Sequence, residues 1–280
     1  MLSNSQIEEF NENGSLVLKN FKPKEELDAL RQATKELISK FDFERHTEIF
    51  RNSSGSNATE YFLSSGDKIA YFFESGAFKE DGQLEVAPEY CLNKIGHAMH
   101  DLHPVFSKFS RDPRLEEISQ EIGLSKPEIW QSMYIFKQPR IGDQVDWHQD
   151  ATYFYTRPQT VKAFWFAIDD STVENGCLWV AGKCSQLRQQ FIVENGRSSM
   201  RRLNDAAWPE LQDARPLEVP AGSLILFDGL LPHFSAPNTS GFARHAFTLH
   251  VLDGKSDYSE QNWLQRKASF PVQGFRLTDD

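Results

Sequence analysis

The sequence predicts a mainly β protein with helical decoration, in which two packed sheets form a jelly roll, the double-stranded β-helix. Three observations predict this fold. After residue 125 the chain consists of short runs rich in β-branched and aromatic residues. Turn sequences such as Glu174-Asn175-Gly176 separate these runs. Several runs are apolar on both faces, which is typical of strands that lie inside a sandwich.

The first 125 residues are expected to form a helix-rich layer that wraps around the β core. Ser5 and Glu8 have the spacing of a capping box, which predicts a short first helix that ends at Gly14. Residues 15–21 are predicted to form a strand. Apolar residues then recur at helical spacing over residues 24–41, which predicts an amphipathic helix that covers the core.

The rest of this layer alternates between polar and apolar segments. Residues 51–60 are polar and are expected to form a loop, and residues 68–73 are expected to form a strand. Further helices are predicted around residues 91–103 and over 112–123, where an Asp-Pro pair begins the helix. No linker rich in glycine, serine or proline follows, so residues 1–280 are expected to form a single domain.

The predicted jelly-roll core covers residues 126–255. Its expected strands lie at 128–138, 161–169, 177–181, 223–228 and 244–252. Between the third and the fourth of these strands, residues 186–214 are polar and are expected to form a helix-leaning insertion. The basic residues of this insertion are interpreted as a solvated helix face rather than as a phosphate site. They are Arg197, Arg201 and Arg202.

The composition excludes two classes of partner. The 280 residues include 30 Lys and Arg against 40 Asp and Glu, which gives a formal charge of −10. Nucleic acid and anionic membranes attract basic surfaces, so neither is expected as the main partner.

The N-terminus lacks the pattern of a secretory signal, and no segment approaches the apolar length of a membrane span. The three cysteines have no CxxC spacing and are expected to be reduced thiols of a cytoplasmic protein.

A candidate metal site begins at His148-Gln149-Asp150. Side chains two residues apart on an extended strand point to the same side, so the imidazole and the carboxylate can converge while Gln149 faces away. His233, which follows the strand at 223–228, is the candidate third ligand. Two histidines and one carboxylate form the facial triad of non-haem iron oxygenases, which leaves positions open for a co-substrate and O2. Iron(II) is expected because no thiolate accompanies these ligands to favour zinc.

A candidate co-substrate site lies beside this metal site. Arg244 begins the predicted strand that follows His233, so the chain can turn back past the metal. Its guanidinium can hold the distal carboxylate of 2-oxoglutarate through two parallel hydrogen bonds while the 2-oxo acid end chelates iron. Ser235, two residues beyond His233, points to the same side if the chain is extended and can donate to the same carboxylate.

At these positions and at several others, the sequence resembles the phytanoyl-CoA dioxygenase family of iron(II)- and 2-oxoglutarate-dependent oxygenases. The resemblance extends from about Ser5 to Trp263. The similar segments are 61–74, 93–100, 131–139, 148–156, 174–182, 221–227 and 262–266. Taken together, these segments are a specific signature of the family.

The resemblance implies both the ligands and the reaction. It places iron on His148, Asp150 and His233, and 2-oxoglutarate on Arg244 and Ser235, within a cupin-like core. It also implies three further residues that line the same pocket, which are Lys94, Met133 and Trp165. The implied reaction consumes O2 and 2-oxoglutarate, releases succinate and CO2, and hydroxylates a small organic substrate. The family name suggests a fatty acyl derivative, and the carboxylate at position 150 favours hydroxylation over halogenation.

One segment departs from the family pattern. After residues 177–180 the family usually reads Pro-Gly-Ser-His, whereas this chain has Ala181-Gly182-Lys183-Cys184. The triad and the arginine are intact. We therefore expect this departure to alter the loop beside the site, and with it the choice of substrate, but not the chemistry.

Two other functions are compatible with the same triad. One is a metal-binding or sensing protein without oxygenase turnover, and the other is a zinc-dependent hydrolase, which requires a general base near the metal. A separate zinc cluster on His97, His100 and His103 is conceivable from their spacing. Packing roles are favoured for these three because no HExxH motif accompanies them. His245 and His250 are likewise interpreted as structural residues.

Overall fold

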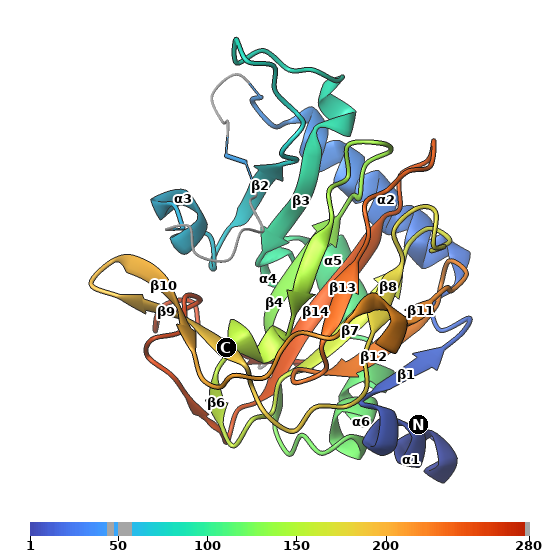
Figure 1. Ribbon diagram of the computed structural model, residues 1–280, viewed down its shortest axis with the longest axis vertical. Helices are drawn as coiled ribbons and strands as arrows, with labels where there is room; N and C mark the ends of the chain where they lie inside the picture. Colours follow the sequence, from blue (N-terminus) through green and yellow to red (C-terminus); the bar gives the residue numbers. More distant parts are fainter. Residues whose placement is uncertain (44–47, 50–57, 278–280) are drawn as a thin grey trace.

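The computed structural model describes residues 1–43, 48–49 and 58–277 of the chain, which form two main antiparallel sheets (Figure 1). The larger sheet has eight strands. In order of pairing they are β1 (Ser15–Leu18), β12 (Leu224–Asp228), β7 (Lys162–Ala167), β14 (Ala246–Asp253), β4 (Pro127–Ile135), β3 (Leu92–His97) and β2 (Ile69–Phe73), with β16 (Gln273–Gly274) also paired to β4. The smaller sheet consists, in order, of β11 (Arg215–Leu217), β8 (Leu178–Val180), β13 (His233–Ser235) and β5 (Val145–His148).

Helices and short strand pairs complete the described part of the chain. The helices are α1 (Asn4–Asn13), α2 (Lys24–Ser39), α3 (Glu60–Leu63), α4 (Met99–Leu102), α5 (Pro104–Ser110) and α6 (Pro113–Glu121), with 3-10 turns η1 (Pro88–Tyr90), η2 (Asp150–Thr152) and η3 (Leu211–Asp213). The strand pairs are β9 (Gln189–Glu194) with β10 (Arg197–Arg202), and β6 (Thr156–Arg157) with β15 (Asp257–Tyr258). Within the described ranges, no helix has the length and apolar character that a membrane crossing requires.

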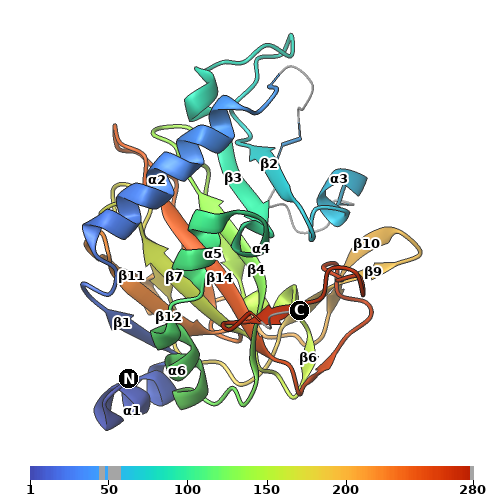
Figure 2. The same ribbon diagram turned by 180° about the vertical axis from the view of Figure 1, so that it is seen from behind.

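Helices cover one face of the larger sheet, where α2, α5 and α6 lie across the strands (Figure 2). Leu30 of α2 and Phe106 of α5 belong to the same buried cluster as Phe247 of β14. The rings of Phe106 and Phe247 are 5.4 Å apart, within the range of favourable aromatic pairs. The amphipathic stripe predicted over 24–41 therefore buries its apolar side against this outer face of the sheet.

The other face of the larger sheet packs against the smaller sheet. Trp165 of β7 and Ile225 of β12 share a second buried cluster with Val180 of β8. Because side chains alternate along a strand, Phe164 and Phe166 face the helices while Trp165 faces the smaller sheet. This two-sheet core confirms the predicted jelly roll. It directs the inner face of the larger sheet toward β5 and β13, which carry the candidate histidines.

Most other predicted elements have counterparts in the structure. The agreeing pairs are 15–21 (β1), 24–41 (α2), 68–73 (β2), 112–123 (α6), 128–138 (β4), 161–169 (β7), 177–181 (β8), 223–228 (β12) and 244–252 (β14). The first helix ends at Gly14 as expected, but its capping box is Ser3 with Gln6 and not Ser5 with Glu8. Of the loop predicted over 51–60, residues 51–57 lie outside the described residues.

The helix predicted around residues 91–103 is wrong. Residues 92–97 form β3, which pairs with β2 on one side and with β4 on the other, and only residues 99–102 are helical. Pairing on both sides satisfies the backbone groups of β3, so tertiary structure overrides the local helical spacing. The first 125 residues are therefore more than a helical layer, since they contribute three strands to the larger sheet.

The helix-leaning insertion predicted over 186–214 is also wrong, because β9 and β10 form a hairpin there, which extends away from the two sheets (Figure 1). Its turn residues Asn195 and Gly196 have φ values of 51° and 74°. An Asn-Gly pair favours these conformations in two-residue hairpin turns, so a sequence signal for the hairpin was present. The basic residues of this segment are exposed, as a solvated face requires. They are Arg197, Arg201 and Arg202.

A buried ion cluster fastens the C-terminal segment to the larger sheet. The carboxylate of Asp101 on α4 lies 2.6 Å from Arg111 and 3.3 Å from Arg266, and all three side chains are at most 7% exposed. Arg266 also donates to the carbonyl of Trp130 on β4, at 3.1 Å. The cluster thus joins three segments that are distant in sequence.

Asp101→Ala is expected to lower the free energy of unfolding by about 3–5 kcal/mol, because it leaves two buried guanidinium groups without their carboxylate. Urea denaturation measures this loss. A suitable control is Lys267→Ala, which removes an ion pair to Asp67 whose lysine is 74% exposed. The control is expected to cost less than about 1 kcal/mol. Equal effects of the two substitutions would contradict the structural role assigned to Asp101.

Candidate metal centre

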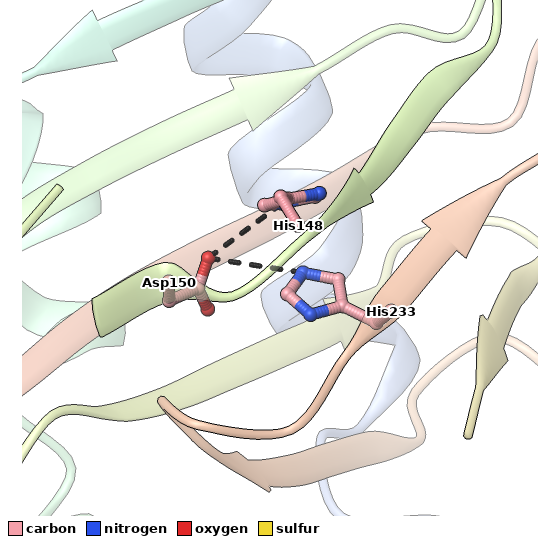
Figure 3. A group of neighbouring side chains, drawn as sticks. All are labelled: His148, Asp150 and His233. Carbon is pink, nitrogen blue, oxygen red and sulfur yellow. Dashed lines mark ion pairs between the residues drawn. The ribbon is translucent and has the colours of Figure 1, made fainter. Parts of the chain in front are cut away.

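The three predicted metal ligands come together between the sheets (Figure 3). His148 ends β5, His233 begins β13, and the two residues face each other in the ladder that pairs these strands. Asp150 begins η2, immediately after β5. Its Oδ1 lies 3.7 Å from Nε2 of His148 and 3.7 Å from Nε2 of His233. One ligand atom from each residue lies within 4.8 Å of the other two, so a single metal ion can contact all three.

The backbone around Gln149 explains the convergence of His148 and Asp150. Gln149 is extended, with φ −123° and ψ 131°, so the residues on either side of it point to one side. The side chain of Gln149 points away and donates to the carbonyls of Gln186 and Leu230, at 3.0 Å and 2.6 Å. The convergence predicted from the sequence spacing is confirmed, although Asp150 itself lies in a 3-10 turn.

Both imidazoles are oriented by backbone carbonyls. Nδ1 of His148 lies 2.8 Å from the carbonyl oxygen of Asp146, and Nδ1 of His233 lies 3.0 Å from that of Leu231. A carbonyl oxygen only accepts, so in each ring Nδ1 carries the proton and Nε2 presents its lone pair to the centre. This tautomer is the one that a metal ligand requires.

The electrostatics of the triad suit a divalent cation. Burial lowers the pKa of His148 to about 3, and the neighbouring His233 acts in the same direction, so His148 is neutral at physiological pH. Burial acts to raise the pKa of Asp150, but His250 and His233 outweigh it and hold the pKa below its ordinary range. The centre therefore combines the neutral imidazole of His148 with an ionised carboxylate, and two imidazoles with one carboxylate are a donor set that fits iron(II).

The alternative zinc cluster does not form. Among the residues that the structure describes, the triad is the only convergent group of three or more possible metal ligands. Nδ1 of His97 lies 2.8 Å from the hydroxyl of Ser65. The nitrogens of His100 contact the hydroxyl of Ser132 at 2.9 Å and the carbonyl of Ile129 at 3.1 Å. Both histidines therefore have packing roles, as favoured from the sequence.

Arg244 lies beside the triad with part of its guanidinium unpartnered. It is 2% exposed, and its Nη2 donates to the carbonyl of Gly176 at 2.8 Å and to the hydroxyl of Ser235 at 3.3 Å. Its Nε and Nη1 are buried and make no hydrogen bond within the described part of the chain. Burial lowers the pKa of Arg244 to about 10, so the group stays charged at neutral pH. Unpartnered N–H groups of a buried cation are suited to a carboxylate.

Ser235 connects Arg244 to the triad. His233 and Ser235 are both buried, while Phe234 between them is partly exposed, so the two residues share one side of β13. The hydroxyl of Ser235 donates to the carbonyl of Gly176 at 2.9 Å, and so its proton is already engaged. Ser235 therefore accepts a hydrogen bond from the guanidinium, and its hydroxyl proton is not available to a bound carboxylate.

Gly176 is a site residue that sequence reasoning missed. Its carbonyl accepts hydrogen bonds from both Arg244 and Ser235. Its φ is +80°, and a Cβ there would lie 2.6 Å from the carbonyl oxygen of Ala236 and 2.6 Å from Cε of Lys137. Only glycine fits this backbone. The signal was present as the turn Glu174-Asn175-Gly176, which was interpreted only as a boundary between strands.

The remaining predicted pocket residues lie on the inner face of the larger sheet. The ring of Trp165 lies 5.2 Å from the guanidinium of Arg244. In the sheet register, Trp165 and Met133 flank Thr248 of β14 on its two sides. Lys94 lies on β3, and its Nζ is 5.5 Å from the ring of Phe72. Each of the three has at least one strand neighbour in the helix-covered cluster, so by alternation its own side chain faces the triad side of the sheet.

Lys94→Met is expected to stabilise the fold at pH 7 by roughly 4 kcal/mol, because a pKa shift of one unit corresponds to about 1.36 kcal/mol. Burial lowers the pKa of Lys94 from 10.5 to about 7. Between these values the unfolded chain binds a proton that the folded chain does not, so the stability of the native protein rises with pH. The advantage of the variant should fall to roughly 1 kcal/mol near pH 10. Urea denaturation at both pH values measures this change.

The control for this prediction is Lys68→Met, which replaces an exposed lysine next to β2. It is expected to change the free energy of unfolding by less than about 0.5 kcal/mol at either pH. A Lys94→Met variant that is no more stable than the control at pH 7 would contradict the prediction.

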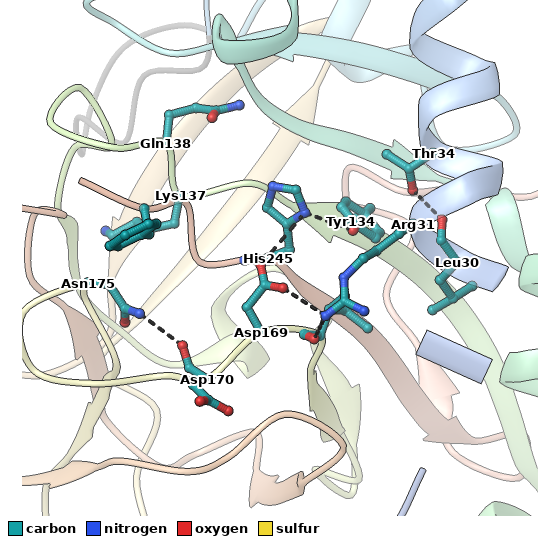
Figure 4. A network of polar contacts seen from close by, with 12 residues as sticks. Leu30, Arg31, Thr34, Tyr134, Lys137, Gln138, Asp169, Asp170, Asn175 and His245 are labelled. Atoms are coloured by element: carbon teal, nitrogen blue, oxygen red, sulfur yellow. Dashed lines mark hydrogen bonds and ion pairs between the residues drawn. The ribbon is translucent and has the colours of Figure 1, made fainter. Parts of the chain in front are cut away.

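The two histidines that flank Arg244 have different surroundings. His245 lies on the helix side, where its Nδ1 is 3.0 Å from the hydroxyl of Tyr134 and 3.8 Å from Asp169, which also binds Arg31 of α2 (Figure 4). It has the structural role that was expected. His250 instead faces the triad, and its Nε2 lies 3.2 Å from Oδ2 of Asp150.

The loop that departs from the family pattern is only partly directed at the site. The backbone N–H of Ala181 donates to the carbonyl of Pro232 at 3.1 Å, next to the ligand His233. The ammonium group of Lys183 instead donates to the carbonyl of Asn11 in α1. The lysine therefore attaches the loop to the first helix and points away from the triad.

Comparison with known proteins identifies the family. The sequence profile of the phytanoyl-CoA dioxygenase family matches residues 10–246. The chain belongs to this family. It is 40% identical over 280 residues to the phytanoyl-CoA dioxygenase domain-containing protein 1 homolog of Dictyostelium discoideum, which covers 97% of this chain and 99% of the relative. It is 39% identical over 272 residues to phytanoyl-CoA dioxygenase 1 of Oryza sativa subsp. japonica, with 95% of each chain covered.

Solved structures share the fold of this phytanoyl-CoA dioxygenase family member. The apo form of EctD from S. alaskensis superposes with a TM-score of 0.64 at 17% identity, covering 99% of this chain and 85% of EctD. SnoK, a non-heme alpha ketoglutarate dependent carbocyclase from nogalamycin biosynthesis, superposes with a TM-score of 0.62 at 15% identity, covering 97% and 96%. Family and fold together support an oxygenase.

Proposed function

We propose that this chain is an iron(II)- and 2-oxoglutarate-dependent dioxygenase that hydroxylates a small organic substrate with O2. One observation carries the proposal. Strand β13 presents His233 of the triad and, on the same side, Ser235, which contacts Arg244. Strand β13 thus links the candidate metal ligands to a cation whose Nε and Nη1 are unpartnered among the described residues. This is the arrangement that a chelating dicarboxylic co-substrate requires.

The residues of the site have separate roles in this proposal. His148, Asp150 and His233 would hold iron(II), and Arg244 would bind the distal carboxylate of 2-oxoglutarate through the unpartnered N–H groups of Nη1. Trp165 lies against the guanidinium and helps to exclude water from it. When bound, iron(II) activates O2, and 2-oxoglutarate supplies two electrons as it is converted to succinate and CO2.

The substrate is proposed to be a largely apolar molecule, with fatty acyl derivatives as the first class to test. Relatives carry the name phytanoyl-CoA dioxygenase. The structure adds an apolar surrounding next to the ligands. The ring of Tyr153, in the turn after Asp150, lies 6.4 Å from that of His148 and 5.7 Å from that of Phe191 on β9. Strand β9, at Phe191, therefore packs beside the turn that carries Asp150, and this end of the hairpin is proposed to form one wall of the substrate site.

We also propose that the chain forms a single catalytic domain and that the protein is cytoplasmic. The two sheets share one buried interior, which favours a single catalytic domain over residues 1–280. Cys91, Cys177 and Cys184 are all unpaired, which fits the reducing environment of the cytoplasm. Imaging of the tagged full-length protein in its own cell type tests the location.

An anaerobic titration tests the proposed site without knowledge of the substrate. Iron(II) and then 2-oxoglutarate are added to the purified protein, and the visible charge-transfer band of a chelated 2-oxo acid is followed. A saturable band is the expected result. No band at any concentration would reject the proposal and would favour a zinc-dependent hydrolase or a binding protein.

Turnover separates an oxygenase from a metal-binding protein that lacks activity. The protein is incubated with a metabolite extract, iron(II) and O2, with and without 2-oxoglutarate. The expected result is a metabolite that gains one oxygen atom only when 2-oxoglutarate is present, together with succinate. Binding of 2-oxoglutarate without any succinate from any fraction would favour the sensing function.

A further inference from the structure

The two oxygens of Asp150 have different neighbours. Oδ1 faces the two triad imidazoles, at 3.7 Å from Nε2 of each. Oδ2 lies 3.2 Å from Nε2 of His250. The contact falls short of full hydrogen-bond alignment, and no other group in the described residues bonds to Oδ2. One oxygen is therefore directed at the metal position and the other at a third histidine.

His250 reaches Asp150 from the opposite sheet. It lies on β14, in the middle of the larger sheet, between Ala163 of β7 and Gln131 of β4. The triad residues belong to β5, β13 and the turn after β5. The contact therefore spans the interior of the jelly roll and ties the metal-binding strands to the larger sheet.

The environment of His250 holds its ring in place. The side chain is 6% exposed, and the ring of Phe154 is stacked on it with centroids 4.9 Å apart and an interplanar angle of 29°. Phe154 is itself 2% exposed, so water has no access from that side. The imidazole is thus fixed in its plane with Nε2 toward the carboxylate.

The hydrogen bonding of His250 differs from that of a core histidine. His100, which is also buried, uses both nitrogens, one on Ser132 and one on Ile129. The Nδ1 of His250 is buried and makes no hydrogen bond among the described residues. Buried polar atoms are normally satisfied, so a histidine retained for stability alone is expected to bond both nitrogens. His250 places its one polar contact on the metal-binding carboxylate.

We propose that His250 is a positioning residue for the metal centre. In this proposal the imidazole proton is on Nε2, which faces Oδ2 of Asp150 at 3.2 Å, so that Oδ1 alone faces the position between His148 and His233. The carboxylate then binds metal through one oxygen and leaves the remaining coordination positions for the co-substrate and O2. The proposal rests on the iron site proposed above. Groups that orient a metal ligand typically change metal affinity by about 10–100-fold when they are lost.

Three substitutions of His250 separate the N–H group from the shape of the side chain. Gln places its amide N–H at about the reach of Nε2, Asn is too short to reach Oδ2, and Leu has no donor. Cobalt(II) is the probe, because its visible absorption reports both the affinity and the coordination of the metal. His250→Asn and His250→Leu are expected to weaken cobalt(II) binding by about 10–100-fold and to alter the absorption bands. His250→Gln is expected to bind within about threefold of the wild type.

A matched control is His100→Leu, which removes a buried histidine that does not contact Asp150. It is expected to lower the thermal unfolding temperature but to keep the wild-type cobalt(II) affinity and spectrum. If His250→Leu fails to fold, the comparison of His250→Asn with His250→Gln still tests the proposal, because both side chains are polar.

Each other outcome rejects the proposal for a distinct reason. Wild-type affinity and spectrum in His250→Asn would show that the histidine does not position the carboxylate. Equal losses in His250→Gln and His250→Asn would show that ring shape, and not the N–H group, matters. A loss in His100→Leu as large as in His250→Asn would show a general effect of destabilisation. Absence of metal binding in the wild type would instead reject the iron site itself.

Discussion

Arg244→Ala is expected to weaken 2-oxoglutarate binding by about 100-fold or more while iron(II) binding stays unchanged. The Nη1 group of the buried guanidinium is unpartnered among the described residues, and its N–H bonds are available for the distal carboxylate. Hydrogen bonds that involve charged groups contribute about 1.5–3 kcal/mol each, and about 1.4 kcal/mol corresponds to a tenfold change in affinity. The anaerobic charge-transfer titration measures both affinities on one sample.

Two further variants test this explanation. Arg244→Lys keeps the charge but not the planar fork, so an intermediate loss is expected. Ser235→Ala is expected to cost less than about tenfold, because its hydroxyl donates to Gly176 and supports the guanidinium only at 3.3 Å. An Arg244→Ala variant with wild-type affinity would exclude Arg244 from the co-substrate site. Thermal unfolding of the metal-free variants checks that each one is folded.

Asp150→Ala is expected to lower iron(II) affinity by more than the 10–100-fold that is typical of residues which only orient a ligand. Asp150 is the only carboxylate of the triad, and two imidazole ligands would remain. Its carboxylate is held ionised in the folded protein, so the variant loses both a ligand atom and a negative charge. Isothermal titration with iron(II) under nitrogen measures the loss.

The control for Asp150→Ala is Asp205→Ala, which removes a carboxylate that is 98% exposed and outside the site. It is expected to bind iron(II) as the wild type does. Asp150→Asn keeps the size of the side chain and is expected to be almost as impaired as Asp150→Ala, because the charge is lost. Undiminished iron(II) binding in both Asp150 variants would place the metal elsewhere.

Sequence patterns predicted the fold correctly where residues close together in the chain decide the conformation. The apolar spacing of Leu27 and Leu30 predicted α2, and both side chains are buried under it. Because side chains alternate along a strand, Trp165 points to the opposite face of β7 from Phe164 and Phe166. In the structure Trp165 packs toward the smaller sheet, and the two phenylalanines pack toward the helices. The convergence of His148 and Asp150 followed from one extended residue between them.

Local patterns failed where a distant segment decides the conformation. Residues 92–97 are a strand because β2 and β4 lie on either side, and neither neighbour is visible in the local spacing of His97 and His100. Gly176 is part of the Arg244 site because the turn before β8 packs on Lys137 and Ala236. Its sequence context indicated a turn but not the contacts of its carbonyl.

The sequence by itself determined the jelly-roll class, and it predicted the three candidate metal ligands and the arginine beside them. These follow from residue types and from spacings of two residues along a strand, which backbone geometry converts directly into a shared face. Only the tertiary structure decided that His250 contacts Asp150 and that Gly176 orients Arg244. These contacts join segments distant in the chain, and they depend on how two sheets pack, which local periodicity does not encode.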